Sequence, residues 1–169
     1  MQAKIFLQAG LAAVAMVVMH TASAHVTLET AQAAAGSYHK TVLRVPHGCG
    51  GSATVKLRVQ IPEGMISVKP QPKPGWQLDM VQGDYDQAYH LHGARITSGV
   101  REVVWTGGPL PDDQFDEFAF MVYLAEDLAE QERVYLPVVQ ECEQGVERWI
   151  YKDENSDSPA PLLRIESGA

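Results

Sequence analysis

Apolar and polar residues alternate with a period of two over most of this chain. The clearest stretch is 53–61, where every second residue is Ala, Val, Leu or Ile and the residues between them are polar. Such alternation predicts a β-strand with one buried face and one wet face. The run FAFMVYL at 118–124 is apolar on both faces and predicts a central strand. Further strands are expected at 38–45, 76–81, 89–96, 102–105, 134–139 and 146–151.

Clusters of Gly and Pro separate these runs, at 46–48, 62–64, 70–75, 98–99, 107–111 and 144–145. Many short strands with turn residues between them predict an all-β sandwich. The polar stretch AEDLAEQE at 125–132 predicts a short helical insertion between two strands. The segment from 154 onward, ENSDSPAP, is polar and predicts a loop or frayed tail. We therefore expect a single domain over 25–153 and a polar tail over 154–169.

The first 24 residues have the composition of a secretory signal peptide. A basic Lys4 precedes an apolar stretch at 5–19, and Ala22-Ser23-Ala24 is a small-x-small cleavage pattern. The alternative is an uncleaved anchor, although the apolar stretch is shorter than the roughly 20 residues of a membrane span. Cleavage after Ala24 makes His25 the first mature residue, and a cut one or two residues away stays open. We expect an exported, periplasmic protein that does not itself span the membrane once processed.

The balance of charge favours cations over nucleic acids as partners. The full chain carries 13 basic and 21 acidic side chains, a net charge of −8. The predicted signal contains a single charged side chain, Lys4, so its removal leaves a net charge of −9 on 145 residues. Phosphate contact needs a basic surface, so nucleic-acid binding is disfavoured, whereas cations are attracted.

The mature chain contains two cysteines, Cys49 and Cys142. An even pair in an exported protein predicts a disulfide. The alternative, a thiolate metal site, lacks the CxxC spacing and the third cysteine that such sites usually have. A bridge would enclose 92 residues and stabilise the fold by about 4 kcal/mol on loop-entropy grounds.

An amino-terminal His25 would be a metal chelator of a kind that no internal histidine can form. Its α-amine and its imidazole Nδ1 close a six-membered ring around an ion. Nitrogen donors in a tetragonal arrangement suit Cu(II), which also has the highest divalent affinity. From this residue alone, the alternative that His25 simply follows the cleavage site is equally open.

A chelate of two nitrogens needs a further ligand, and Glu117 is a candidate. It precedes Phe118 in the apolar run, on the face opposite Phe118 and Phe120, where a carboxylate needs a partner or a metal. A salt bridge to a neighbouring arginine is the alternative, slightly favoured by the sequence alone. His90 and His92 alternate on an expected strand and are a weaker candidate site, whereas His39 and His47 do not suggest ligands. Nucleophile-elbow, Walker and GxGxxG motifs are absent from the sequence.

Three separated segments resemble the YcnI-like bacterial copper-binding domain family. They are the cleaved signal followed by HVT and VPHGCGGSATVKLRVQIPEG, the stretch PDDQFDEFAF, and PVVQECEQGVERW near the end. The resemblance implies an immunoglobulin-like sandwich that binds one Cu(II) in a monohistidine brace. It implies His25 and Glu117 as ligands and Trp149 beside the metal, although an aromatic residue at 149 also suits a sandwich core. Some relatives continue into a membrane helix, whereas this chain stops at Ala169.

The expected function is an exported copper-binding protein, not an enzyme, that acts in copper trafficking or homeostasis. The resemblance implies a membrane copper transporter or a periplasmic copper chaperone as partner. The alternative is a copper-dependent oxidase of the histidine-brace type, which needs a second histidine beside His25. A metal-free adhesive sandwich is a third possibility, because fold does not dictate function.

Overall fold

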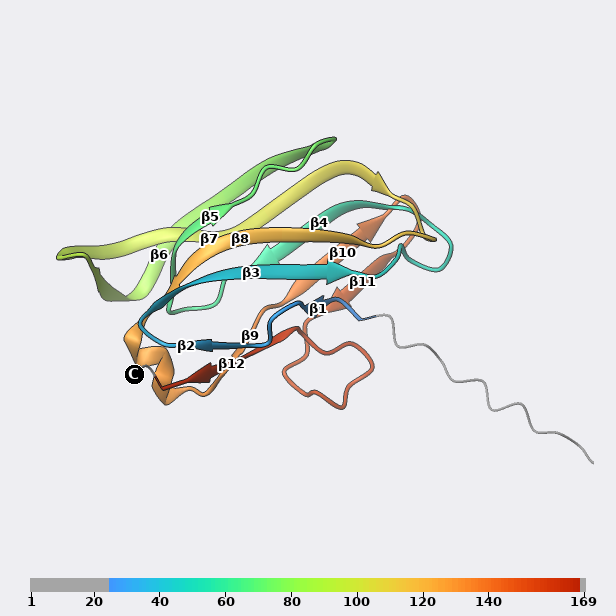
Figure 1. The fold of residues 1–169 in the computed structure, drawn as a ribbon. Helices are drawn as coiled ribbons and strands as arrows, with labels where there is room; N and C mark the ends of the chain where they lie inside the picture. The colour runs from blue at the N-terminus through green and yellow to red at the C-terminus, as the bar shows by residue number, and fades with distance from the viewer. Residues whose placement is uncertain (1–24, 168–169) are drawn as a thin grey trace, which may run out of the picture.

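The computed structural model describes residues 25–167, which form twelve β-strands and one 3-10 helix (Figure 1). The predicted signal peptide, residues 1–24, lies outside the described residues. The elements are β1 (Thr27–Leu28), β2 (Gln32–Ala34), β3 (Ser37–Val45), β4 (Thr54–Gln60), β5 (Met65–Pro70), β6 (Trp76–Leu91), β7 (Ala94–Leu110), β8 (Asp116–Leu124), η1 (Glu126–Glu130), β9 (Arg133–Tyr135), β10 (Val138–Cys142), β11 (Val146–Trp149) and β12 (Leu162–Glu166).

Two larger sheets form the sandwich, and a smaller one closes its side. The first sheet has the order β1-β3-β8-β5, and the second has the order β11-β10-β4-β7-β6. The third sheet, β2-β12-β9, combines an early strand with the last one. The predicted all-β sandwich is confirmed. Within residues 25–167, no helix has the length and apolar character that crossing a bilayer requires.

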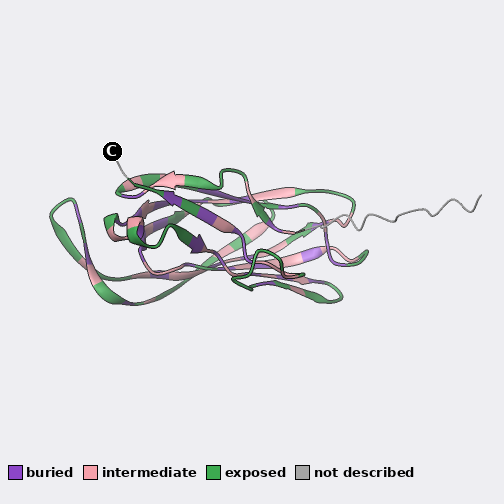
Figure 2. Cartoon of the chain, turned by 90° about the horizontal axis from the view of Figure 1, so that it is seen from below, coloured by how far each residue is buried: buried purple, intermediate pink, exposed green. Residues whose placement is uncertain are grey.

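The core lies between the two larger sheets (Figure 2) and follows the predicted alternation over 57–61, whereas Thr54, expected on the wet face, is fully buried next to a β-bulge. Leu57 and Val59 of β4 are fully buried, and Phe118 and Phe120 of β8 are each 1% exposed. The predicted central position of 118–124 is confirmed, because β8 pairs with β3 on one side and β5 on the other. The aromatic ring of Trp105 packs edge-on against Phe118 at 5.4 Å, which fills the centre of the sandwich.

The expected helical insertion at 125–132 is wrong. Only a 3-10 helix forms, over Glu126–Glu130, and Ala125 gives it no side-chain cap. Leu128 is the one buried residue of this turn, so there is too little apolar surface to offset the cost of nucleating an α-helix.

The expected polar tail over 154–169 is wrong for Leu162–Glu166, which forms β12 between β2 and β9. Leu163 is fully buried and Ile165 is 7% exposed, whereas their neighbours point outward. The alternation is only five residues long and follows a Pro-rich stretch, so the sequence conceals it.

The expected strand at 89–96 is a hairpin tip. β6 ends at Leu91 and β7 begins at Ala94, and His92 and Gly93 turn the chain with φ of 51° and 78°. The two strands form a long hairpin that extends past one end of the sandwich (Figure 1). The expected strand at 134–139 is also divided, because the chain passes from β9 in the third sheet to β10 in the second around Pro137.

Candidate metal centre

The predicted disulfide between Cys49 and Cys142 is present, with a Cα–Cα distance of 6.0 Å. Cys49 lies in the turn that follows β3, and Cys142 ends β10. The bridge therefore joins the turn after the first sheet to a strand of the second sheet, at one end of the sandwich.

His25 and Trp149 lie against each other where the edges of the two larger sheets meet. His25 directly precedes Val26 and edge strand β1, and Trp149 ends edge strand β11. Their ring centroids are 5.1 Å apart and the rings are tilted by 53°. Trp149 is 7% exposed and belongs to the main core cluster, so its indole packs in the core and also contacts His25.

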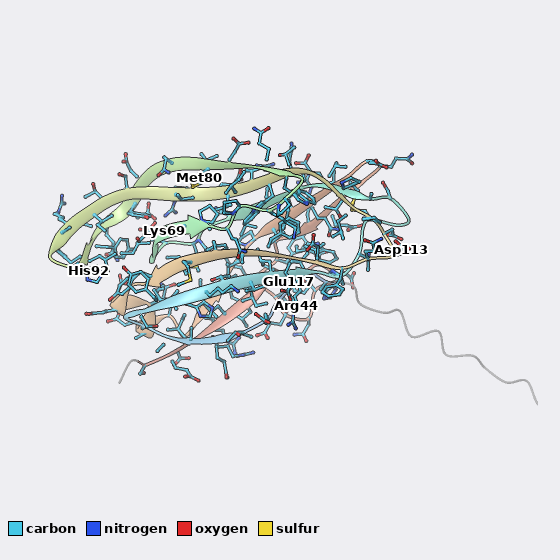
Figure 3. The ribbon with its side chains drawn as sticks, turned by 45° about the horizontal axis from the view of Figure 1, so that its top comes forward. Arg44, Lys69, Met80, His92, Asp113 and Glu117 are labelled. Atoms are coloured by element: carbon cyan, nitrogen blue, oxygen red, sulfur yellow. A yellow bond between two sulfur atoms is a disulfide. The ribbon has the colours of Figure 1, made fainter. Side chains whose placement is uncertain are left out.

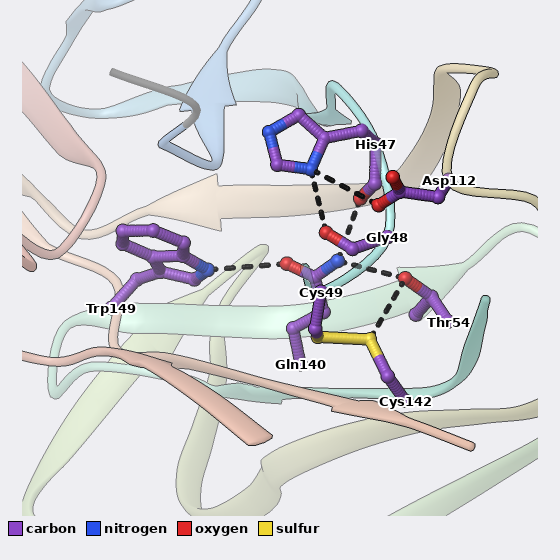
Figure 4. A network of polar contacts seen from close by, with 8 residues as sticks. All are labelled: His47, Gly48, Cys49, Thr54, Asp112, Gln140, Cys142 and Trp149. Carbon is purple, nitrogen blue, oxygen red and sulfur yellow. Dashed lines mark hydrogen bonds and ion pairs between the residues drawn. A yellow bond between two sulfur atoms is a disulfide. The ribbon is translucent and has the colours of Figure 1, made fainter. Parts of the chain in front are cut away.

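A buried glutamine holds the indole in place. Gln140 of β10 is 1% exposed, and its Oε1 accepts a hydrogen bond of 3.3 Å from Trp149 Nε1. Its Nε2 donates to the carbonyl oxygen of His47 at 2.8 Å and to the hydroxyl of Thr54 at 2.7 Å. Thr54 Oγ1 in turn lies 3.6 Å from the sulfur of Cys142 (Figure 4). One amide therefore connects the indole, the turn at His47 and the disulfide.

We expect Gln140→Leu to lower the free energy of unfolding by about 2–4 kcal/mol, because it leaves the indole N–H, the His47 carbonyl and the Thr54 hydroxyl without a buried partner. Urea unfolding followed by tryptophan fluorescence measures the change. Gln60→Leu is the matched control, since Gln60 is an exposed glutamine on the neighbouring strand β4. Equal stability of the two variants would show that the hydrogen bonds of Gln140 contribute nothing.

Glu117 lies on the outer face of the first sheet, paired with an arginine (Figure 3). It stands opposite Arg44 of β3 in the strand register, and Arg44 Nε donates to Glu117 Oε1 at 3.0 Å. Arg44 Nη2 donates to Glu29 Oε1 at 3.1 Å. The hydrogen bond with Glu117 is the largest cause that raises the pKa of Arg44 above its usual value. The salt bridge that the sequence offered as the alternative to a metal ligand is thus present.

The position of Arg44 sets a condition on metal binding by Glu117. Strand β3 lies between β1 and β8, so Arg44 stands between Thr27 and Glu117 in the register. The side chains of Arg44 and Glu117 are 46% and 41% exposed, and exposed pairs of this kind contribute only about 0–1 kcal/mol. Glu117 can therefore exchange the guanidinium for a cation at low cost, while Arg44 keeps Glu29.

Side chains alone do not make a metal site in the described part of the chain. Among residues 25–167, no three His, Cys, Asp or Glu side chains gather closely enough to hold an ion. In the full chain the nitrogen of His25 is an amide bonded to Ala24. A metal centre at His25 therefore depends on the main-chain amine that cleavage after Ala24 would create.

The weaker histidine candidates do not form a pair. His92 lies in the hairpin turn, and its Nε2 is 3.0 Å from the hydroxyl of Tyr38. His90 is on β6, opposite Arg95. His39 is half-buried, and burial lowers its pKa. The suggested site at His90 and His92 fails because the chain reverses between β6 and β7.

Comparison with known proteins places the chain in a family. Residues 25–165 match the model described as a domain of unknown function, DUF1775. The chain belongs to this family. The match covers nearly the whole described region, and the resemblance to the YcnI-like family seen in the sequence is confirmed.

A curated relative and a solved structure are similar to this member of the DUF1775 family, the first in sequence and the second in fold. The chain is 27% identical over 149 residues to the copper-binding protein CutI of Bacillus subtilis (strain 168), an alignment that covers 86% of this chain and 64% of the relative. The chain thus spans less than two thirds of that relative's length. A crystal structure of an uncharacterized Nocardia farcinica protein with an immunoglobulin-like fold superposes with a TM-score of 0.63 at 24% identity, over 85% of this chain and 99% of that one. The predicted immunoglobulin-like fold is confirmed.

Sequence reasoning missed two residues of this DUF1775 domain. Gln140 occupies an inward position of β10, between Val138 and Cys142, and a polar residue at an inward position was the available signal. Arg44 interrupts the buried run at the end of β3, but only the register shows that it faces Glu117.

Proposed function

We propose that the chain, once cleaved after Ala24, is an exported Cu(II)-binding protein that acts in copper trafficking or homeostasis. The α-amine and the Nδ1 of His25 would hold the ion, and an oxygen of Glu117 would complete a monohistidine brace. The observation that carries this proposal is the contact of His25 with Trp149, whose indole is held by a buried glutamine. The name of the B. subtilis relative, a copper-binding protein, supports the choice of metal.

The chemistry of an amino-terminal histidine favours Cu(II) at neutral pH. The free α-amine has a reference pKa of about 8, so the ion displaces its proton at modest cost. Cu(II) exceeds the other common divalent ions in affinity for nitrogen donors. The acidic balance of the chain adds a field that attracts cations.

We infer a carrier and not a catalyst from the ligand types. A carboxylate is a hard ligand and favours Cu(II) over Cu(I), which prefers sulfur donors. In a carrier the ion is cargo, and an exchangeable oxygen ligand such as Glu117 suits its uptake and release. The partner that delivers or receives the ion would be a membrane copper transporter or a periplasmic copper chaperone.

We expect Glu117→Gln to weaken Cu(II) binding by about tenfold or more, since it replaces an anionic oxygen donor by a neutral one. The paramagnetic resonance spectrum of the bound ion should change with it. Titration of Cu(II) into the chain beginning at His25 measures the affinity, with one site expected.

Glu29→Gln is the matched control, because Glu29 binds the same guanidinium of Arg44 on the same face. This variant should leave the spectrum unchanged. A Glu117→Gln spectrum identical to that of the parent chain would remove Glu117 from the ligand set.

A further inference from the structure

We propose that Arg44 competes with the copper ion for Glu117, and that this competition sets how readily the protein releases the ion. The proposal rests on the proposed function in one respect, the role of Glu117 as a ligand. It assigns a function to a residue outside the ligand set, because Arg44 contacts the carboxylate that the ion would bind.

Arg44 stands between the two halves of the proposed site. In the register of the first sheet, Arg44 lies opposite Thr27 of β1 on one side and opposite Glu117 of β8 on the other. Directly opposite residues share a face of the sheet, and His25 comes two residues before Thr27. Two strand spacings of about 4.8 Å each separate β1 from β8. An ion that bridges His25 and Glu117 would therefore lie over β3, beside the guanidinium.

The guanidinium of Arg44 is shared between two carboxylates. Its Nε donates to Glu117 Oε1 at 3.0 Å, and its Nη2 donates to Glu29 Oε1 at 3.1 Å. It makes one hydrogen bond to each carboxylate, whereas strong arginine pairs have two parallel bonds to one carboxylate. The bond to Glu117 can therefore break and form again while the bond to Glu29 keeps the guanidinium nearby.

A bound dication and the guanidinium of Arg44 would exclude each other from Glu117. Both are cations that neutralise the same carboxylate, and they repel each other at close range. Glu29 follows β1 and Glu117 belongs to β8, so the two carboxylates come from either side of β3. When the ion takes Glu117, Glu29 remains as the partner of Arg44, and the guanidinium keeps a counter-charge.

The neighbouring lysines do not compete for this carboxylate. Lys73 pairs with the side chain of Asp116 and donates to the main-chain oxygen of Glu117 at 3.1 Å. Lys40 lies on β3 opposite Met121, and it forms no ion pair with any residue that the structure describes. Among residues 25–167, Arg44 is thus the one cation that contacts the carboxylate of Glu117.

A competitor that is part of the protein acts mainly on release. Once an oxygen of Glu117 leaves the ion, Arg44 is held close enough to take it, because a tethered group has a high effective concentration. The ion is then left with the two nitrogens of His25, which a receiving protein can replace more easily than three donors. Differences in affinity between closely related complexes also lie mostly in the dissociation rate.

Arg44→Gln, made in the chain beginning at His25, tests the proposal. The variant should bind Cu(II) about three- to tenfold more tightly and should lose it to excess chelator more slowly by a similar factor. An exposed ion pair accounts for up to about fivefold, and the lost repulsion between guanidinium and ion adds to it.

Lys40→Gln is the matched control, because it removes the same charge from the same strand and face. Lys40 is four residues from Arg44, a distance of about 13 Å along β3. That distance exceeds the screening length of about 8 Å at physiological salt, so the affinity should change by less than about twofold.

Two further measurements separate competition from a general effect of charge. In the Glu117→Gln background, Arg44→Gln should change the affinity by less than about twofold, because no carboxylate is left to compete for. In the chain prepared without metal, the NMR signal of the Arg44 Nε–H should shift when Glu117 is replaced by Gln, because that hydrogen bond changes its acceptor.

The outcomes distinguish this proposal from the proposed function. Unchanged or weaker binding by Arg44→Gln, an equal gain in Lys40→Gln, or an equal gain in the Glu117→Gln background overturns the role of Arg44 and leaves the ligands in place. Unchanged Cu(II) affinity and spectrum in Glu117→Gln alone overturn the proposed brace. An Arg44 signal that is indifferent to Glu117→Gln also overturns the competition, and that measurement holds even where Arg44→Gln fails to fold.

Discussion

One residue added ahead of His25 should weaken Cu(II) binding by about 100-fold or more, a loss of about 2.7 kcal/mol. The added residue converts the α-amine into an amide, which removes one of the two donors that close the six-membered ring. The imidazole of His25 and its contact with Trp149 remain. Competition with a chelator of known affinity at neutral pH, in the parent and extended chains, measures the difference.

A residue added after Ala169 is the control, since it has the same mass and leaves the amine free. Its affinity for Cu(II) should equal that of the parent chain. Equal affinity of all three chains would show that the amine of His25 does not bind the ion, and the brace would be wrong. Weak binding by the parent chain itself would argue for the metal-free sandwich.

Loss of the disulfide should lower the free energy of unfolding by about 4–5 kcal/mol. Cys49 and Cys142 are 93 residues apart, so the bridge removes much of the entropy of the unfolded chain. Urea unfolding of the oxidised chain and of a Cys49→Ala/Cys142→Ala variant measures the change. Because Thr54 touches Cys142 and shares Gln140 with Trp149, copper affinity should also fall in the variant.

Added reductant is the control for the disulfide. It should destabilise the oxidised chain to the level of the double variant and leave the double variant itself unchanged. A difference of less than about 1 kcal/mol between the oxidised chain and the variant would contradict the loop-entropy argument.

The hydrophobic pattern predicted those strands whose buried and exposed faces can be recognised within one short stretch of sequence. The alternation at 53–61 and the doubly apolar run at 118–124 gave β4 and the central β8, because each pattern matches a fixed pair of faces. The strand β12 was missed because its place depends on β2 and β9, which lie far away in the sequence. The tip at His92 was missed because alternation continues through both arms of a hairpin.

The same distinction between local and long-range signals applies to the residues of the candidate site. His25 and Glu117 were visible because a cleavage pattern and a carboxylate in an apolar run are local signals. The role of Arg44 could not be predicted in this way. Its contact with Glu117 depends on the register between β3 and β8, and the hydrophobic pattern does not specify that register. Gln140 was also missed, because only its tertiary contacts show that one amide joins Trp149, the His47 carbonyl and Thr54.

The position of β12 bears on when the metal site proposed at His25 would form in a chain that is exported as proposed. His25 lines a cavity of about 270 Å³ together with Pro159, Ala160 and Pro161, which lead into β12. Strand β12 pairs in parallel with β2, so residues 159–166 pack beside residues 25–34. In a chain that emerges amino terminus first, the cavity beside His25 would form only when residues 159–161 arrive next to it. Copper binding before residues 159–161 have emerged would therefore be weak, and full affinity would appear only once they are in place.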